Sequence, residues 1–429
     1  MHFGPLALVC ATLTAAAPAQ SAGFEAPPDE SPESILPADQ IAGEDFHVVA
    51  PVRSDGLMRH YVVESRFGVF EAYGHQSLEV RLREVAALTK ISKTTDLDVV
   101  AKAVVRRTEA DAKTVLAFAM KPVETVAAIP KGVTHLFAGY TAQAKEVSEE
   151  VHKDSREFSE AAHKGGTAST SMQVRNKARK DARRYADRYF GVSAAERRWY
   201  QQLGVDPYTS TDALRKAVAH LARVDAAASF GLKFAPIPGI PYAGDLHRAM
   251  DAIYNEDPAV LRARRRMTLA GYGLEQAEID GFESALLLNP TRQSQIEQTA
   301  NSLDGVDGRA ELFRHAMALT SDEEIQVFLQ SIELLVTIHR AQPLARILPG
   351  VRLPAGERTD GRVVVCGSFD AVYWTEEVAG LAQSLRAALP AAAAAYELWL
   401  SGSVSELARA ELAARGWEVH DAPFLEARD

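Results

Sequence analysis

The sequence predicts an α+β fold that is predominantly α, with an N-terminal β-meander, a long helical middle and a small C-terminal βαβαβ domain. Three observations predict it. Short β-type runs punctuated by glycine precede residue 74, helical periodicity dominates from about 95 to 340, and strand and helix patterns alternate after 361. At 429 residues the chain has room for two or three domains, each with its own core.

The beginning of the chain has the composition of an export signal. Its first 21 residues include no Asp, Glu, Lys or Arg, and Ala17-Pro18-Ala19 supplies the small-x-small pattern that signal peptidase cleaves. We therefore expect a signal peptide over 1–19 and a periplasmic or secreted protein, a disordered Ala-rich start being the alternative. Residues 20–45 hold four prolines and seven acidic residues without Lys or Arg, which predicts a disordered acidic linker.

Residues 46–92 are predicted to form the β-meander and a helix that covers it. Three β-type runs, 47–52, 57–64 and 69–73, are separated by turn residues, and Asp55-Gly56 is typical of a tight hairpin. The following helix places its apolar residues on one face, namely Leu78, Leu82, Val85 and Leu88. We expect that face to be buried.

The helical domain is predicted over 93–341, and explicit start signals mark several of its helices. Asp257-Pro258, Asn289-Pro290 and the capping box Ser321-x-x-Glu324 each predict a helix N-terminus. A Pro- and Gly-punctuated link over 342–361 leads to a small α/β domain at 360–429. Its strands at 363–365, 396–400 and 417–420 have short connections through two helices, the second capped by Ser403-x-x-Glu406, which favours a parallel sheet.

A turn after the first strand of this domain carries the most suggestive chemical residues, Cys366, Ser368 and Asp370. Strand-end turns in open α/β sheets are where phosphates and nucleotides bind. Gly367-Ser368-Phe369-Asp370 resembles the opening of the nucleotidyltransferase signature, although Tyr373-Trp374-Thr375-Glu376 stands where that family has two histidines. A ligand site at these three residues and a purely structural turn with a buried Cys366 thiol both remain open.

Metal and cofactor motifs are not recognisable in the sequence. The twelve histidines have no metal-ligand spacing, and the best local group is Asp245, His247 and Asp251. Surface ion pairing at i,i+4 explains this group without chemistry. G-x-S-x-G, Walker A and G-x-G-x-x-G are also missing from the sequence, so we predict no metal and no cofactor.

Basic residues concentrate between 175 and 198, where nine Lys and Arg residues stand against three acidic ones. We select Arg179, Arg183, Arg184 and Arg188 as candidate partner-binding residues, with a solvated helix face as the alternative. The net charge of −10 and the expected export both argue against a nucleic-acid partner. The contact we expect is an envelope component or another protein.

The hairpin at 54–64, the turn at 203–208 and the C-terminal α/β unit together resemble a set of uncharacterised exported proteins of Gram-negative bacteria. The resemblance implies architecture and compartment but no activity. We therefore expect a non-enzymatic exported protein that binds a partner or the cell envelope through its helical domain. The alternative is an enzyme or small-ligand binder that uses the turn at 366–370. Apolar runs after the signal are shorter than the ~20 residues that span a bilayer, so no transmembrane segment is expected in the mature chain, and its oligomeric state stays open.

Overall fold

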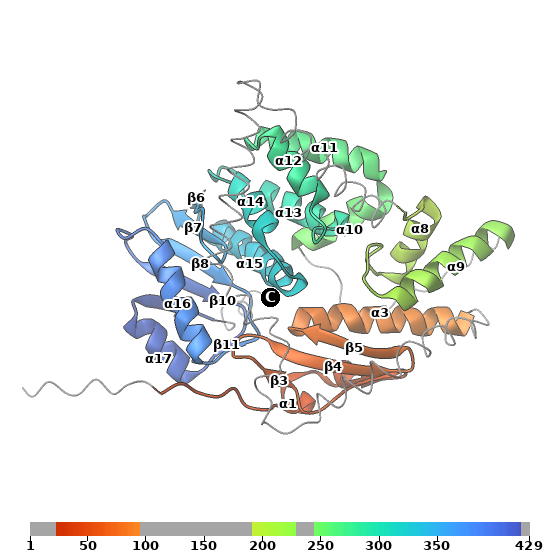
Figure 1. Ribbon diagram of the computed structural model, residues 1–429, viewed down its shortest axis with the longest axis horizontal. Coiled ribbons are helices and arrows are strands. Elements are labelled where there is room, and N and C mark those ends of the chain that lie inside the picture. Colours follow the sequence, from red (N-terminus) through yellow and green to blue (C-terminus); the bar gives the residue numbers. More distant parts are fainter. Residues whose placement is uncertain (1–22, 95–190, 229–243, 422–429) are drawn as a thin grey trace, which may run out of the picture.

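The computed structural model describes residues 23–94, 191–228 and 244–421 (Figure 1). It confirms the α+β class with a predominance of helix: strands come first, helices fill the middle and a second sheet ends the described chain. In the view of Figure 1 the N-terminal sheet lies at the bottom, the C-terminal sheet at the left and the helical middle above them. The predicted signal peptide lies outside the described residues.

The N-terminal unit is an antiparallel sheet built around one long strand. That strand, β4 (Arg59–Ser65), pairs with β2 (Phe46–Val48), β3 (Arg53–Ser54) and β5 (Gly68–Tyr73), and β1 (Ala42–Gly43) pairs with β2. Gly56 has a φ of 100° between β3 and β4, which confirms the predicted hairpin turn.

Helix α3 (His75–Thr94) is buried on two sides. Leu78 and Leu82 pack on the sheet, whereas Val85 and Leu88 pack on α8 (Ala194–Leu203) and α9 (Asp212–Ala228). The predicted apolar face is therefore confirmed. The two helices after the gap at 95–190 belong with the N-terminal unit through this shared core.

Residues 23–45 are ordered, which differs from the predicted disordered linker. They form α1 (Pro32–Ile35), α2 (Ala38–Ile41) and a strap over 23–30 that runs along the folded chain. The Glu30 carboxylate receives two hydrogen bonds, of 2.6 and 2.8 Å, from the Arg59 guanidinium. The Glu25 carboxylate accepts from the Trp374 amide and the Ser405 hydroxyl. An acidic segment too polar for a core of its own is thus held by donors on distant parts of the chain.

The helical middle comprises α10 (Gly244–Asn255), α11 (Pro258–Gly271), α12 (Gln276–Ser284), α13 (Pro290–Ser302), α14 (Ala310–Ala318) and α15 (Asp322–Ala341). All three predicted start signals are confirmed. Asp257 caps α11, Asn289 caps α13, and Ser321 with Glu324 forms the capping box of α15. No helix among the described residues has both the length and the apolar composition needed to cross a membrane.

The C-terminal sheet has the strand order β12-β10-β8-β7-β6. Strands β8 (Val363–Gly367), β10 (Tyr396–Leu400) and β12 (Trp417–His420) are parallel and alternate with α16 (Glu376–Ala388) and α17 (Glu406–Ala414), as predicted. The antiparallel β6 (Leu344–Ile347) and β7 (Ala355–Arg358) extend this sheet. The unit therefore begins near 344, inside the stretch predicted as a link, because four-residue strands show too little alternation to be recognised.

Helices cover both faces of this sheet. Val364 and Cys366 face α15 and the helical middle, whereas Val363 and Val365 face α16 and α17. A small parallel pair, β9 (Ala371–Val372) with β11 (Ser403–Val404), continues from the strand ends. Because Ser403 lies in β11, the N-cap of α17 is Ser405 and not Ser403 as predicted.

Candidate functional site

The three predicted site residues of the turn at 366–370 are all engaged in contacts within the fold. Cys366 is fully buried beneath α15, and burial raises the pKa of its thiol, so a reactive thiolate is disfavoured. The Ser368 hydroxyl lies 2.8 Å from the Gln330 side-chain oxygen and 3.0 Å from the Ser401 hydroxyl. The Ser368 amide donates to the Ser331 hydroxyl at 2.9 Å. The polar groups that a phosphate would need are already engaged within the fold.

Asp370 joins the C-terminal sheet to the N-terminal unit. Its two carboxylate oxygens accept backbone hydrogen bonds from Arg59 at 2.9 Å and His75 at 3.0 Å. The Asp370 amide donates to the Leu57 carbonyl at 3.0 Å. Burial raises the pKa of Asp370, whereas the two amide donors lower it. The hairpin at 54–59 and the start of α3 therefore cover the turn, which supports its structural reading.

A second partly buried carboxylate, Asp55, lies in the same junction. It accepts hydrogen bonds from the amides of Leu57 at 2.9 Å and Met58 at 2.8 Å, which hold the hairpin turn closed. Burial raises the pKa of Asp55 to about 6, and the negative charge of Asp370 adds to this effect. The junction thus keeps two carboxylates that accept hydrogen bonds only from backbone amides within the described chain.

The remaining predicted residues are either on the surface or outside the described part. His247 and Asp251 form an ion pair at 3.4 Å with both side chains more than half exposed, as the surface interpretation expects. Arg179, Arg183, Arg184 and Arg188 lie outside the described residues.

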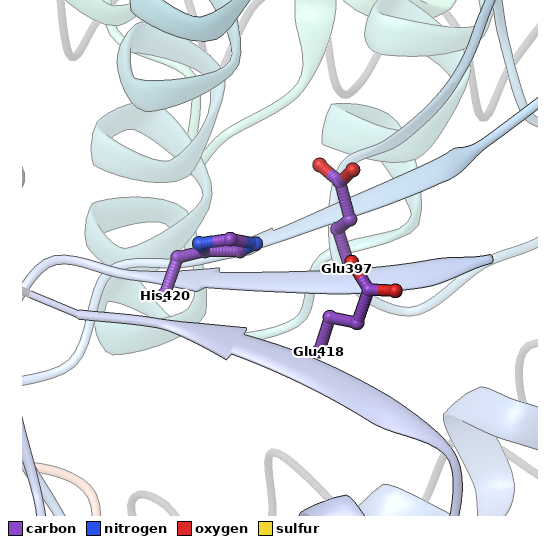
Figure 2. Close-up of side chains that lie close together, drawn as sticks. All are labelled: Glu397, Glu418 and His420. Atoms are coloured by element: carbon purple, nitrogen blue, oxygen red, sulfur yellow. The ribbon is translucent and has the colours of Figure 1, made fainter. Parts of the chain in front are cut away.

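One group in the described chain brings three potential metal ligands within 4.8 Å: Glu397, Glu418 and His420 on the neighbouring strands β10 and β12 (Figure 2). An arginine occupies the same space. The Arg362 guanidinium lies 3.0 Å from Glu397 and 2.8 Å from Glu418, and Arg358 also lies 3.0 Å from Glu397. Since guanidinium groups already neutralise both carboxylates, this cluster is an ion-pair network on the sheet.

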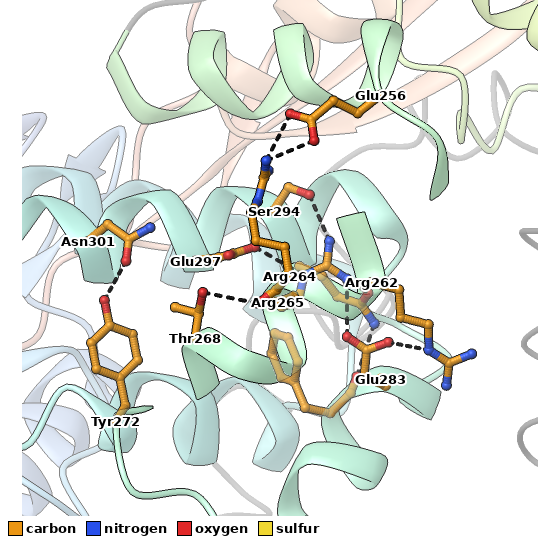
Figure 3. Close-up of polar contacts among 12 residues, drawn as sticks. Glu256, Arg262, Arg264, Arg265, Thr268, Tyr272, Glu283, Ser294, Glu297 and Asn301 are labelled. Carbon is orange, nitrogen blue, oxygen red and sulfur yellow. Dashed lines mark hydrogen bonds and ion pairs between the residues drawn. The ribbon is translucent and has the colours of Figure 1, made fainter. Parts of the chain in front are cut away.

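A second charged cluster, in the helical middle, is also structural (Figure 3). Arg265 of α11 is 3% exposed and lies 3.3 Å from Glu283 of α12 and 3.4 Å from Glu297 of α13. Its guanidinium also donates to Gln293 and Ser294. Three helices are tied through one buried arginine.

The polar cleft is a cavity of about 450 Å³ between the N-terminal unit and the helical middle. Its walls come from β5, α3, the loop at 206–210, α10 and the N-terminal ends of α13 and α15. Most of the side chains that line it are polar: Glu71, Tyr73, Gln76, Ser77, Glu79, Arg81, Arg83, Glu84, Asp206, Tyr208, Thr209, Ser210, Arg215, Asn289, Thr291, Arg292, Gln295, Asp322, Glu323, Gln326 and Glu333.

Two carboxylates of the polar cleft, the buried Glu84 and the partly buried Asp206, accept hydrogen bonds from side chains of other elements. Glu84 of α3 accepts hydrogen bonds from the hydroxyls of Thr209 and Thr211, the latter at 2.7 Å, and from Arg81 at 2.8 Å. Asp206 accepts from the Thr291 hydroxyl at 2.7 Å, and burial raises its pKa. The wall is therefore held in place across segments far apart in the sequence.

Other polar groups of the polar cleft have no partner in the described chain. The side chains of Gln76, Ser77 and Gln326 make no hydrogen bond with another described residue, although each lines the cavity. The Tyr73 hydroxyl is buried and lacks a hydrogen-bond partner among the same residues. Unused donors and acceptors beside fixed carboxylates are what a polar ligand requires.

Sequence reasoning missed this site because its residues are spread from 71 to 333 and form no motif. The turn at 203–208 was noticed, but nothing local connects Asp206 to Thr291 or Glu84 to Thr209. Comparison of the chain with known proteins adds no assignment: no family model, no curated protein and no solved structure matches it.

Proposed function

We propose that this protein binds a small polar ligand in the polar cleft. The observation that carries the proposal is a ligand-sized space whose walls combine anchored carboxylates with unused amides and hydroxyls. A volume of about 450 Å³ falls within the roughly 300–1,000 Å³ of known ligand pockets. Polar groups beside a void contribute little to folding, so a binding role accounts for them better than stability does.

The wall chemistry favours a ligand rich in hydrogen-bonding groups. Carboxylates accept, arginines donate, and Gln76 and Gln326 do both. Tyr73 and Tyr208 add aromatic surface to the same cavity. Sugars, amino acids and amines match this mixture, whereas an extended apolar ligand would leave the polar groups without partners.

Export and partner binding fit the same proposal. A periplasmic or secreted binding protein agrees with the signal-like residues 1–19 and with the resemblance to exported proteins of Gram-negative bacteria. Binding to an envelope component through Arg179, Arg183, Arg184 and Arg188 is a second proposal supported by the charge pattern. Arg→Glu changes at these positions should release the protein from the envelope in fractionation; unchanged retention at low salt would contradict it.

Ligand binding at the turn at 366–370 is the less favoured alternative. Cys366 is buried, and Ser368 and Asp370 bond to neighbouring segments of the fold. A ligand there would have to displace the hairpin at 54–59. The polar cleft needs no such displacement.

The test is a thermal-shift screen of the full chain against neutral sugars, amino acids and small amines. A ligand at 100 times its dissociation constant adds about 2.7 kcal/mol to the free energy of unfolding, so a shift of several degrees is expected. Gln76→Ala with Gln326→Ala should remove the shift. Gln383→Ala, at an exposed position on α16, is the matched control and should preserve it. Equal shifts in both variants would place binding elsewhere.

A further inference from the structure

We infer that the ligand of the polar cleft carries a positive charge, an amine or guanidine group, which is seated against Glu71 and Glu323. The inference rests on the proposed function and names the chemical class of the ligand. Two observations support the inference: the cavity wall has more carboxylates than arginines, and the carboxylates without an arginine or lysine partner have known positions in that wall.

The arginines of the polar cleft are already paired. Arg81 lies 2.8 Å from Glu84 and Arg83 lies 3.7 Å from Glu79. Arg292 lies 2.6 Å from Asp322. The fourth, Arg215, pairs with Asp212 just outside the cavity. These guanidinium groups therefore have their counter-charges within the protein and offer little to an anionic ligand.

Four carboxylates of the wall have no arginine or lysine ion pair in the described chain: Glu71, Asp206, Glu323 and Glu333. Two of them accept from neutral donors: Asp206 from the Thr291 hydroxyl and the Tyr208 amide, and Glu333 from Gln295 at 2.9 Å. The charges of Arg292 and Arg248 act on Asp206 and Glu333, respectively, without forming an ion pair with them. Burial raises the pKa of both carboxylates, which shows how poorly solvated they are. Among the residues that the structure describes, Glu71 has only a distant contact with His60, at 3.9 Å, and Glu323 makes no hydrogen bond or ion pair.

Tyr73 lies near the two carboxylates with the fewest contacts in the described chain, Glu71 and Glu323. Its buried hydroxyl lacks a hydrogen-bond partner in the described chain, and Glu71 and Glu323 both lie close enough to raise its pKa. Glu71 comes from β5 and Glu323 from the first turn of α15, and both line the polar cleft together with Tyr73. A cation between them would gain two charge-assisted contacts, and the tyrosine ring offers it an aromatic surface.

Calorimetric titration of the full chain with matched charged and neutral probes tests the inference. The pairs are 1,4-diaminobutane against 1,4-butanediol and glucosamine against glucose, at low ionic strength because salt screens charge. We expect the amine of at least one pair to bind about tenfold or more tightly than its neutral counterpart. Glu323→Gln should reduce this preference for the amine about tenfold.

The control is Glu377→Gln at an exposed position on α16, which should keep the preference of the native protein. Neutral probes that bind as tightly as the amines, or a preference that survives Glu323→Gln, would overturn the inference and leave the proposed function intact. If the chain binds none of the four probes at 10 mM and gives no shift in the wider screen, both fall. An unchanged melting temperature of Glu323→Gln verifies that the variant is folded.

Discussion

The turn at 366–370 and the polar cleft both contain buried carboxylates, but their partners differ. In the turn, the Asp370 oxygens accept from backbone amides of Arg59 and His75, roughly 300 residues away in the sequence. In the cleft, Glu84 accepts from three side chains, Asp206 accepts from the Thr291 hydroxyl and the Tyr208 amide, and open space lies beside both. A carboxylate saturated by backbone amides joins pieces of a fold. A carboxylate that is hydrogen-bonded to the wall of a cavity and lies next to the open space is placed to contact a ligand.

The largest effect is expected at Asp370. Asp370→Ala leaves two buried amides without acceptors, which should lower the free energy of unfolding by about 2–5 kcal/mol, measured by urea denaturation. Asp370→Asn keeps one acceptor oxygen and should lose less. If Asp370→Ala unfolds like the native protein, the turn is not the junction described above, and a ligand role there becomes the better explanation.

Gly402 tests how tightly the same turn is packed. A Cβ at this position would overlap the backbone carbonyls of Phe369 and Asp370, so Gly402→Ala should cost about 1–3 kcal/mol. Gly380→Ala provides the control: it lies in α16, where a Cβ meets nothing within 4 Å, and alanine should stabilise that helix by up to about 1 kcal/mol. A neutral Gly402→Ala would indicate a looser turn, open to ligands.

Asp55 gives the junction a pH signature. The pKa of Asp55 is about 6 in the folded protein and about 3.8 when exposed. The folded protein is therefore destabilised while Asp55 is charged, and it regains this stability as the pH falls below 6. Asp55→Asn removes this cost. We expect the variant to gain about 1 kcal/mol relative to the native protein between pH 5 and pH 7.5 in urea denaturation. His60 and His315, whose pKa values burial lowers to about 4, are present in both proteins and cancel. A pH-independent difference would contradict a buried Asp55.

The smallest effect on stability is expected in the polar cleft. Glu323→Gln removes one of several like charges without breaking a hydrogen bond of the described chain, so the free energy of unfolding should change by less than about 0.5 kcal/mol or rise slightly. Thermal unfolding without ligand measures it. A loss as large as that of Asp370→Ala would make Glu323 a structural residue and remove the contrast between the two regions.

Local signals predicted most of the fold. Helix caps such as Ser321 and turn residues such as Gly56 act within a few residues, and the apolar face of α3 follows from its own periodicity. The ordered segment at 23–45 and the strands β6 and β7 escaped prediction because each is stabilised by partners distant in the sequence. The polar cleft could not be predicted from the sequence for the same reason, because Asp206 and Thr291 come into contact only once the chain is folded.

The contacts of Glu25, in the strap at 23–30, can form only late in the synthesis of the chain. Glu25 is held by groups at positions 374 and 405, so its contacts close loops of about 350 and 380 residues. These two bonds are unable to form together until residue 405 has been synthesised, whereas the bonds of Glu30 to Arg59 and Val52 close loops of only about 30 residues or fewer and can form early. The Glu25 bonds therefore form last, and they join the start of the chain to the C-terminal unit only when that unit has been completed.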